Sequence, residues 1–472
     1  MFTLADVLEP LTGRQWPKAT LVISDAVTDS RQAIPASLFI AVIGERTDGH
    51  EYLSAAFKNG ASVALIQRDV DPSIPVIDTR SPLPEDFTPP AAPFAIRVDD
   101  TLVSLQKIAG AWRSKLDVTV IGITGSVGKS TTKELVADVL SRRFRTIKNQ
   151  GNLNNEIGLP ITLLKMSRGT QCAVTEMGFY QPGDIKFLCD LAKPQVGILT
   201  NIGTVHASRA GSQEAIARGK SELVESLPAA PEGTAILNFD DPWIKPMATL
   251  TKARIFFYGL TSEAELWANN IQSNGLDGIS FTAHYHGESF HLNVPLIGQH
   301  SVQTGLRAIA SGLTLGLTWD EIVSGLQNSR NQLRLVAVHT EQGALILDDT
   351  YNASPESTLA ALGLLSEIPG RHIAVLGGMF ELGQYEKSGH EMVGIRASEV
   401  ADRLITLGDN GKMIADAALR AGMRSEKIEN LDNTDQVVNS LRSLLREGDV
   451  VLVKGSHGLR MDRIVTDLEV EE

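Results

Sequence analysis

The sequence contains the stretch Val118-Thr-Val-Ile-Gly-Ile-Thr-Gly-Ser-Val-Gly-Lys-Ser-Thr-Thr132, which reads as an apolar strand, a glycine-rich turn and the start of a helix. In such a turn, backbone N–H groups close around phosphate oxygens, because glycine leaves no side chain in the way. Lys129 is placed to meet the β- and γ-phosphates, and Ser130 a magnesium ion. The stretch therefore predicts a nucleoside triphosphate site formed by Thr124, Gly125, Ser126, Val127, Gly128, Lys129 and Ser130.

This motif departs from the strict P-loop spacing, which places a glycine five residues before Gly128. Position 123 is Ile, and the additional glycine is Gly125. A strand-to-helix turn can carry glycines for structural reasons alone, and that alternative stands beside the nucleotide site. The sequence Gly-Lys-Ser after a strand rich in Val and Ile favours nucleotide binding.

Length and composition limit the class of protein. A chain of 472 residues predicts roughly three domains, each with its own core. Lys and Arg total 43 against 56 for Asp and Glu, a net charge of −13, which argues against a generally basic nucleic-acid surface. The two cysteines, Cys172 and Cys189, lack metal-ligand spacing and predict core thiols in a reducing compartment.

The N-terminus, Met1-Phe-Thr-Leu-Ala-Asp6, has no basic region followed by an apolar stretch. No run approaches the roughly 18 apolar residues that span a bilayer. We therefore expect a cytoplasmic protein without a transmembrane segment, and we expect it to be a monomer.

Strand and helix patterns divide the chain into three α/β segments, expected at 1–98, 99–330 and 331–472. The first ends near the proline-rich stretch 81–93, which cannot continue a helix or a central strand. The second alternates strands with helices around the P-loop, so a mainly parallel sheet is expected. The expected strands are 37–43 and 62–66 in the first segment, and 172–176, 196–200 and 234–238 in the second.

The third segment resembles a second doubly wound, Rossmann-like domain. It has no GxGxxG after its first strand, so it is not predicted to bind a dinucleotide. Ligands in such sheets bind at the carboxyl ends of strands, where Asp348-Asp349 and Lys454-Gly455-Ser456 fall. Its expected strands are 344–348, 372–376, 403–407 and 449–453.

Several polar residues near strand ends are open to two interpretations. Glu176 ends an apolar strand, where a magnesium ion would compensate a buried carboxylate, but a helix cap or salt bridge is equally consistent. His206 follows a similar strand and, taken alone, is more often a core residue than a ligand. Lys220 lies in a helix that Ser212 can cap, and alone it reads as a surface lysine. Arg334 and Asp349 suit either a nucleotide or an interdomain ion pair.

The order of these motifs resembles the Mur ligase family, the ATP-dependent amide-forming enzymes of peptidoglycan precursor synthesis, over essentially the full length. The family segments are Thr124–Ser130, Gly151–Pro160, Thr175–Gly178, Asn201–His206 and Gly219–Glu222. Segments of the branch that adds D-alanyl-D-alanine are Asp348–Pro355, Leu376–Gly383 with His390, and Val453–Ser456.

The resemblance implies roles for individual residues in the second and third segments. ATP and Mg²⁺ are the implied cofactors, and Glu176, His206 and Ser130 are implied to bind magnesium. Lys220 is implied to be carbamylated, so that its carbamate oxygens help to hold a second magnesium ion. Lys129 would act on the transferred phosphoryl group. Arg334 and Asp349 match positions that contact the nucleotide from the third domain.

The resemblance also assigns substrates, UDP-N-acetylmuramoyl-tripeptide to the first domain and D-alanyl-D-alanine to the third. Asn352 and Ser354 are implied to contact the dipeptide. Ser30 and Arg31 offer a hydroxyl and a fork-shaped cation for a diphosphate, although a turn with a surface arginine is the alternative. The second implied UDP-binding segment, Gly44–His50, supplies Thr47, Asp48, Gly49 and His50.

The sequence departs from the family pattern in two segments. Many members have His-Asn-x-x-Asn, with both asparagines near the adenine, where this chain has Ser301 and Thr304. A hydroxyl can give one hydrogen bond but not the paired donor and acceptor of an amide. Gly378 replaces the usual aspartate of the branch.

The expected chemistry is carboxylate activation by ATP to an acyl phosphate, then attack by the amine of the dipeptide. His206 is a candidate contributor to removal of the amine proton. The alternatives are a sister ligase that adds one amino acid, a ligase for D-alanyl-D-lactate, a kinase, and a P-loop regulator that makes no bond. The third residue of the tripeptide, lysine or diaminopimelate, is left open.

Overall fold

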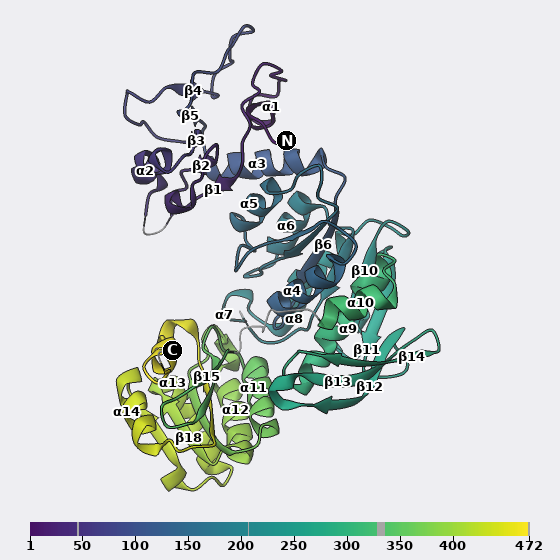
Figure 1. Ribbon diagram of the computed structural model, residues 1–472, viewed down its shortest axis with the longest axis vertical. Helices are drawn as coiled ribbons and strands as arrows, with labels where there is room; N and C mark the ends of the chain where they lie inside the picture. The colour runs from purple at the N-terminus through teal and green to yellow at the C-terminus, as the bar shows by residue number, and fades with distance from the viewer. Residues whose placement is uncertain (45–46, 206, 328–335, 471–472) are drawn as a thin grey trace. The chain divides into compact units, whose positions relative to one another are not determined.

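Figure 1 shows a computed structural model of the chain, which describes residues 1–44, 47–205, 207–327 and 336–470. The described residues form three β-sheets and divide into two units. The first unit comprises 1–122, 144–178 and 185–196, and the second comprises 123–143, 179–184 and 197–472. Helices alternate with mostly parallel strands in these sheets, which confirms the predicted α/β class.

The first sheet has five parallel strands in the order β1-β2-β3-β5-β4. Its buried strands β2 and β3 lie within the two predicted strand segments. The proline-rich stretch 81–93 connects β4 to β5. The elements are α1 (Leu4–Thr12), β1 (Ala26–Val27), β2 (Leu38–Ile40), α2 (Leu53–Lys58), β3 (Val63–Ile66), β4 (Val76–Asp78) and β5 (Phe94–Arg97).

The second sheet has nine strands in the order β14-β13-β12-β11-β10-β9-β6-β8-β7. The P-loop strand and the three other predicted strands are present. The strands are β6 (Thr119–Thr124), β7 (Thr146–Lys148), β8 (Cys172–Glu176), β9 (Val196–Leu199), β10 (Thr234–Asn238), β11 (Arg254–Gly259), β12 (Leu266–Ser273), β13 (Ile279–Tyr285) and β14 (Glu288–Val294).

The antiparallel extension β12-β13-β14 is a feature that the sequence analysis missed. Its last hairpin turns through His286 and Gly287, both with positive φ, at 49° and 84°. Two central residues with positive φ favour a two-residue hairpin turn, but His-Gly is a weaker signal than Asn-Gly. The expected parallel sheet is therefore correct for the P-loop half and incomplete beyond β11.

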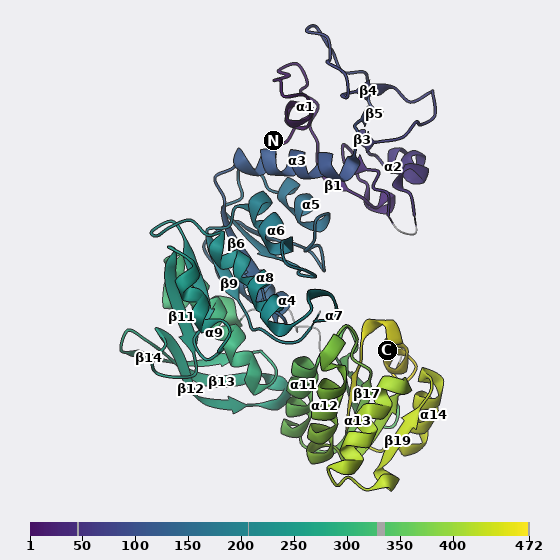
Figure 2. The same cartoon turned by 180° about the vertical axis from the view of Figure 1, so that it is seen from behind.

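Helices α9 and α10 pack against the P-loop helix α4; Figure 2 labels α4 and α9, and Figure 1 labels α10. A β-carbon at Gly325 would lie 2.5 Å from the Cα of Val139, so glycine is needed for the close approach of α10. The helices are α3 (Thr101–Ser114), α4 (Lys129–Leu140), α5 (Gly158–Leu164), α6 (Asp184–Ala192), α7 (Ala207–Ala210), α8 (Gln213–Glu225), α9 (Val302–Thr314) and α10 (Trp319–Gln327).

The third sheet has the order β15-β16-β20-β17-β18-β19, with β15 antiparallel to β16 and the other pairs parallel. Four strands match the predicted segments, whereas β15 and β19 were not predicted. The strands are β15 (Val336–His339), β16 (Leu345–Asp349), β17 (Arg371–Gly377), β18 (Arg403–Leu407), β19 (Ile428–Leu431) and β20 (Asp449–Lys454).

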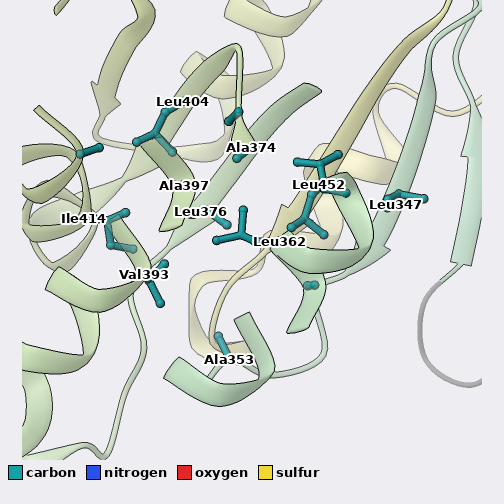
Figure 3. Packing of buried hydrophobic residues seen from close by; sticks show 14 of the residues in the cluster. Leu347, Ala353, Leu362, Ala374, Leu376, Val393, Ala397, Leu404, Ile414 and Leu452 are labelled. Carbon is teal, nitrogen blue, oxygen red and sulfur yellow. The ribbon is translucent and has the colours of Figure 1, made fainter. Parts of the chain in front are cut away.

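Helices cover both faces of this third sheet. Ala374 and Leu376 of β17 point to one core, shown in Figure 3, while Ile373 and Val375 point to the other. This alternation is the two-residue period of a strand buried on both faces. The helices are α11 (Pro355–Glu367), α12 (Glu386–Val400), α13 (Gly408–Arg420), α14 (Thr434–Leu444) and α15 (Asp462–Thr466).

The two cysteines are free and buried, as expected for core thiols. Burial raises the pKa of the Cys172 thiol to about 11. Within the described ranges, no helix is both long and apolar enough to cross a membrane.

Truncation of Leu362 tests the core in Figure 3. Its side chain is fully buried on α11, so Leu362→Ala should lower the free energy of unfolding by about 2–5 kcal/mol. The matched control is Leu419→Ala on α13, because Leu419 is 49% exposed. Urea denaturation of both variants measures the difference, and equal losses would contradict the described packing.

Candidate nucleotide site

The P-loop connects β6 to α4 through a turn that requires glycine. Gly125 has a φ of 147°, and a β-carbon there would lie 1.8 Å from Oγ1 of Thr200. Gly128 has a φ of 81° and is the N-cap residue of α4. Both are conformations that residues with side chains rarely adopt. The first turn of α4 then contains Lys129 and Ser130, and its N-terminus suits an anion.

Residues after β9 hold the turn in place through its backbone. The hydroxyl of Thr200 donates to the carbonyl of Val127 at 2.7 Å, and the Val127 N–H donates to Oδ1 of Asn201 at 2.9 Å. The Ser126 N–H donates to the Asn201 carbonyl at 2.9 Å. The Gly203 N–H donates to Oγ of Ser126 at 2.8 Å. The conformation of the P-loop therefore depends on the adjacent strand end.

Two lysines converge on one carbonyl of this turn. The Nζ of Lys129 donates to the Gly125 carbonyl at 2.8 Å and to the Ser126 carbonyl at 3.1 Å. The Nζ of Lys220 donates to the same Gly125 carbonyl at 2.9 Å. The Lys220 side chain is 1% exposed, and its Nζ lies 4.6 Å from the centroid of the Phe179 ring. The interpretation of Lys220 as a surface lysine is therefore wrong.

Glu176 ends β8 in the first unit and is 3% exposed. Its Oε1 accepts a hydrogen bond from Nδ2 of Asn154 at 2.9 Å. Asn149 binds both backbone groups of Glu176, accepting from its N–H at 2.9 Å and donating to its carbonyl at 3.2 Å. The segment that precedes α5 thus fixes the Glu176 carboxylate, whereas its approach to the P-loop stays a prediction.

The described residues do not form a complete magnesium site, so this site stays a prediction. In the ranges that the structure describes, no group of three or more His, Cys, Asp and Glu side chains is placed to hold a metal ion. His206, one predicted ligand, lies outside the described residues.

In the third sheet, Asp349 forms an ion pair with a buried lysine. Its Oδ2 lies 2.6 Å from the Nζ of Lys454, which also donates to the Asn352 carbonyl at 2.8 Å. The hydroxyl of Ser354 caps α11 by accepting from the Ser357 N–H at 3.2 Å. Arg334 lies outside the described residues. The nucleotide and dipeptide contacts assigned to this region remain predictions.

In the first sheet, the structure brings Asp48 and His50 together with Arg68. The Gln67 N–H donates to Nε2 of His50 at 3.0 Å, so the ring proton on Nδ1 donates to Oδ1 of Asp48 at 2.6 Å. Arg68 pairs with the other oxygen of Asp48. Gly49 is required because its β-carbon would lie 2.8 Å from the Val42 nitrogen.

Thr47 is exposed, and its carbonyl accepts from the Gly44 N–H at 2.9 Å. Ser30 is buried, whereas Arg31 is exposed and forms an ion pair with Asp29 at 2.7 Å. Hydrogen bonds from Arg31 lower the pKa of Asp29. The proposed diphosphate cation therefore already has a carboxylate neighbour.

Both departures from the family pattern have a local structural explanation. The Ser301 hydroxyl donates to the Ile297 carbonyl at 2.7 Å, and Oγ1 of Thr304 accepts from Nη2 of Arg307 at 3.0 Å. Both hydroxyls are therefore engaged within the protein. A β-carbon at Gly378 would lie 2.7 Å from Cβ of Asn410, so Asn410 fills the space of an aspartate side chain.

Sequence reasoning missed the residues that support these groups. Thr200, Asn201 and Asn149 bind backbone groups, Asn154 binds the Glu176 carboxylate, and Arg68 lies well beyond the segment that it binds. Asn201 and Asn154 do fall within the quoted family segments. Their position in these segments indicated that they matter, but the spacing of residues alone does not show which group each asparagine binds.

Two family models match the chain. The Mur ligase middle domain matches residues 123–312. The model described as Mur ligase, glutamate ligase domain, matches residues 333–457. These ranges contain the P-loop and the third sheet, respectively.

Full-length relatives and solved structures show the same similarity. A UDP-N-acetylmuramoyl-tripeptide–D-alanyl-D-alanine ligase of a Synechocystis species is 36% identical, over 95% of this chain and 92% of the relative. A crystal structure of MurF from Acinetobacter baumannii has 29% identity and a TM-score of 0.82, covering 98% of both chains. MurF ligase from Thermotoga maritima in complex with ADP has 28% identity and a TM-score of 0.76, covering 94% of this chain and 97% of that one.

Substitution of Gly125 tests the geometry of the turn. Gly125→Ala should abolish nucleotide binding, because its methyl group would overlap Oγ1 of Thr200. Gly422→Ala is the matched control, because Gly422 has a φ of 102° and its β-carbon would meet nothing within 4 Å. Equilibrium dialysis with labelled ATP measures both. Normal binding by Gly125→Ala would show that the described turn is incorrect.

Proposed function

The chain belongs to the Mur ligase family, and we propose that it joins D-alanyl-D-alanine to UDP-N-acetylmuramoyl-tripeptide with hydrolysis of ATP. The product is UDP-N-acetylmuramoyl-pentapeptide, a precursor of peptidoglycan. The observation that carries this proposal is the P-loop on which Lys129 and Lys220 converge, in a chain that matches such ligases over nearly its full length. The sister ligases and the P-loop regulator are not favoured, because relatives of 30–36% identity over nearly the whole chain carry the name of this ligase.

The first step activates the terminal carboxylate of the tripeptide. A carboxylate oxygen attacks the γ-phosphorus of ATP, the bond to the β,γ-bridging oxygen breaks, and an acyl phosphate and ADP form. Repulsion between the carboxylate and the triphosphate opposes this step. The ammonium of Lys129 and the N-terminus of α4 offset that charge where it develops.

The second step forms the amide bond. The amine of D-alanyl-D-alanine attacks the acyl carbon, and the tetrahedral intermediate expels inorganic phosphate. The amine gives up a proton, and His206 is the proposed contributor to its removal. Closure of the domains would exclude water, which otherwise hydrolyses an acyl phosphate.

Magnesium is the proposed metal, and the donor set suits it. The Ser130 hydroxyl and the fixed Glu176 carboxylate are hard oxygen ligands of the kind that Mg²⁺ takes together with substrate phosphates. His206 and a carbamylated Lys220 complete the proposed set. When bound, the metal would neutralise phosphate charge.

Carbamylation of Lys220 is also a proposal. Its Nζ donates to the Gly125 carbonyl, and a carbamate nitrogen keeps one N–H, so this hydrogen bond fits both forms. The stacking over Phe179 favours the ammonium form. The two forms differ in charge and therefore have different effects on a triphosphate.

We assign the substrates to three domains with the predicted boundaries. Residues 1–98 would bind the UDP part, 99–330 ATP, and 331–472 the dipeptide. The separate sheets support this division, because β1–β5, β6–β14 and β15–β20 fall within the three ranges. Ser30, Arg31, Thr47, Asp48, Gly49 and His50 are the proposed UDP contacts, Arg334 and Asp349 the further nucleotide contacts, and Asn352 and Ser354 the dipeptide contacts.

A cytoplasmic, monomeric enzyme completes the proposal. ATP and UDP-linked precursors are supplied inside the cell, and two buried free thiols suit a reducing compartment.

Product formation tests the proposed reaction. With ATP, magnesium and UDP-N-acetylmuramoyl-tripeptide, addition of D-alanyl-D-alanine should release one phosphate for each pentapeptide detected by mass spectrometry. D-Alanine alone is the control and should give no product. Both the lysine and the diaminopimelate tripeptides are supplied, and absence of pentapeptide with both would refute the proposal.

Substitution of Lys220 tests the carbamate. Lys220→Ala should lose ligase activity, and short carboxylates such as acetate should restore part of it by replacing the carbamate. Lys193→Ala is the control, because the Lys193 side chain is 67% exposed. Full activity of Lys220→Arg, which cannot form the carbamate, would contradict the modification.

A further inference from the structure

Arg307, on the face of α9 that packs against the P-loop region, is a buried cation that the proposed mechanism does not use. The residue is 4% exposed. Its Nε donates to the Gln303 carbonyl at 3.0 Å, and its Nη2 donates to Oγ1 of Thr304 at 3.0 Å. Its Nη1 is buried and, within the described parts of the chain, has no hydrogen-bond partner.

No carboxylate of the described residues forms an ion pair with Arg307. Burial lowers the pKa of Arg307, and the Tyr258 phenol partly offsets that effect. The Tyr258 ring lies 5.8 Å from the guanidinium carbon, and its hydroxyl donates to the Leu199 carbonyl at 3.2 Å. A buried positive charge with an unmade hydrogen bond is costly unless an anion compensates it.

Arg113 shows how this protein satisfies a buried arginine that has a structural role. It is 5% exposed, and its three guanidinium nitrogens donate to the carbonyls of Ala192, Leu116 and Val118 at 2.8–2.9 Å. Arg307 has the same burial but keeps one nitrogen unpartnered. The comparison indicates that the unpartnered nitrogen of Arg307 binds a partner outside the chain.

The position of Arg307 shows where such a partner would bind. A β-carbon built on Gly128 would lie 3.8 Å from Nη2 and 3.9 Å from Nη1 of Arg307. Gly128 is the N-cap residue of the P-loop helix, so the guanidinium lies beside the phosphate cradle. Helices α4 and α9, which carry the two groups, pack together (Figure 2).

We propose that Arg307 binds a phosphate oxygen of the ATP held by the P-loop, an inference that rests on the proposed ATP-dependent function. A guanidinium has donors and no acceptor, and its fork matches a phosphate. The Ser301 and Thr304 hydroxyls are engaged within the protein. Rather than binding the nucleotide itself, Thr304 orients Arg307. Helix α9 therefore contributes a positive charge to the nucleotide site.

Nucleotide binding by Arg307→Gln in the full chain tests the proposal. Equilibrium dialysis with labelled ATP, ADP and adenosine should show about 10- to 100-fold weaker binding of ATP and ADP, the loss expected for one charge-assisted hydrogen bond. Adenosine, which has no phosphate, should bind equally to wild type and variant. Unchanged ATP binding, or an equal loss for adenosine, would overturn the proposal. Failure of the wild-type protein to bind ATP would instead refute the proposed function.

Thermal unfolding without nucleotide separates this role from a structural one. Arg307→Met should melt at the same temperature as wild type or higher, because it removes an uncompensated buried charge. Arg113→Met is the matched control and should melt lower, because it removes the donors to three carbonyls. A decrease for Arg307→Met as large as that for Arg113→Met would contradict the proposal.

Discussion

The contact of Gly125 with Thr200 is the constraint on which the nucleotide site depends. A side chain at position 125 has no room, so the turn after β6 lies directly against the end of β9. There Thr200 and Asn201 bind the backbone of the turn, and Lys129 and Lys220 share its first carbonyl. The charged groups of the site are therefore positioned by backbone conformation before any phosphate arrives, which is the preorganisation that phosphoryl transfer requires.

The sequence predicted the α/β class and most parallel strands, because buried strands appear as short apolar runs between helical patterns. The burial of Lys220 is a feature that these patterns did not predict. Its helix and its cap by Ser212 were predictable, but burial depends on Gly219, where a β-carbon would lie 2.1 Å from the Phe179 ring. The antiparallel extension β12-β14 depends on a weak turn signal. The partners of Glu176 are asparagine side chains from another segment, Asn149 on its backbone and Asn154 on its carboxylate. Neither follows from spacing.

The replacement of two amides by Ser301 and Thr304 changes what α9 offers to a nucleotide. Both hydroxyls are buried and engaged, and Thr304 fixes the guanidinium of Arg307 beside Gly128. Such a charge destabilises the protein without a ligand and strengthens binding of a phosphate with one. The site thus combines cations from α4 and α9 around one turn, and a carboxylate substrate can approach the triphosphate only when such charge is present.

Transfer of an oxygen atom tests the central claim, formation of an acyl phosphate, most directly. The tripeptide substrate is prepared with ¹⁸O in its terminal carboxylate, and the phosphate released during pentapeptide synthesis is examined by mass spectrometry. If the carboxylate attacks the γ-phosphorus, each turnover places one carboxylate oxygen in the released phosphate. Phosphate that carries no ¹⁸O would show that the carboxylate is not phosphorylated and would contradict the mechanism.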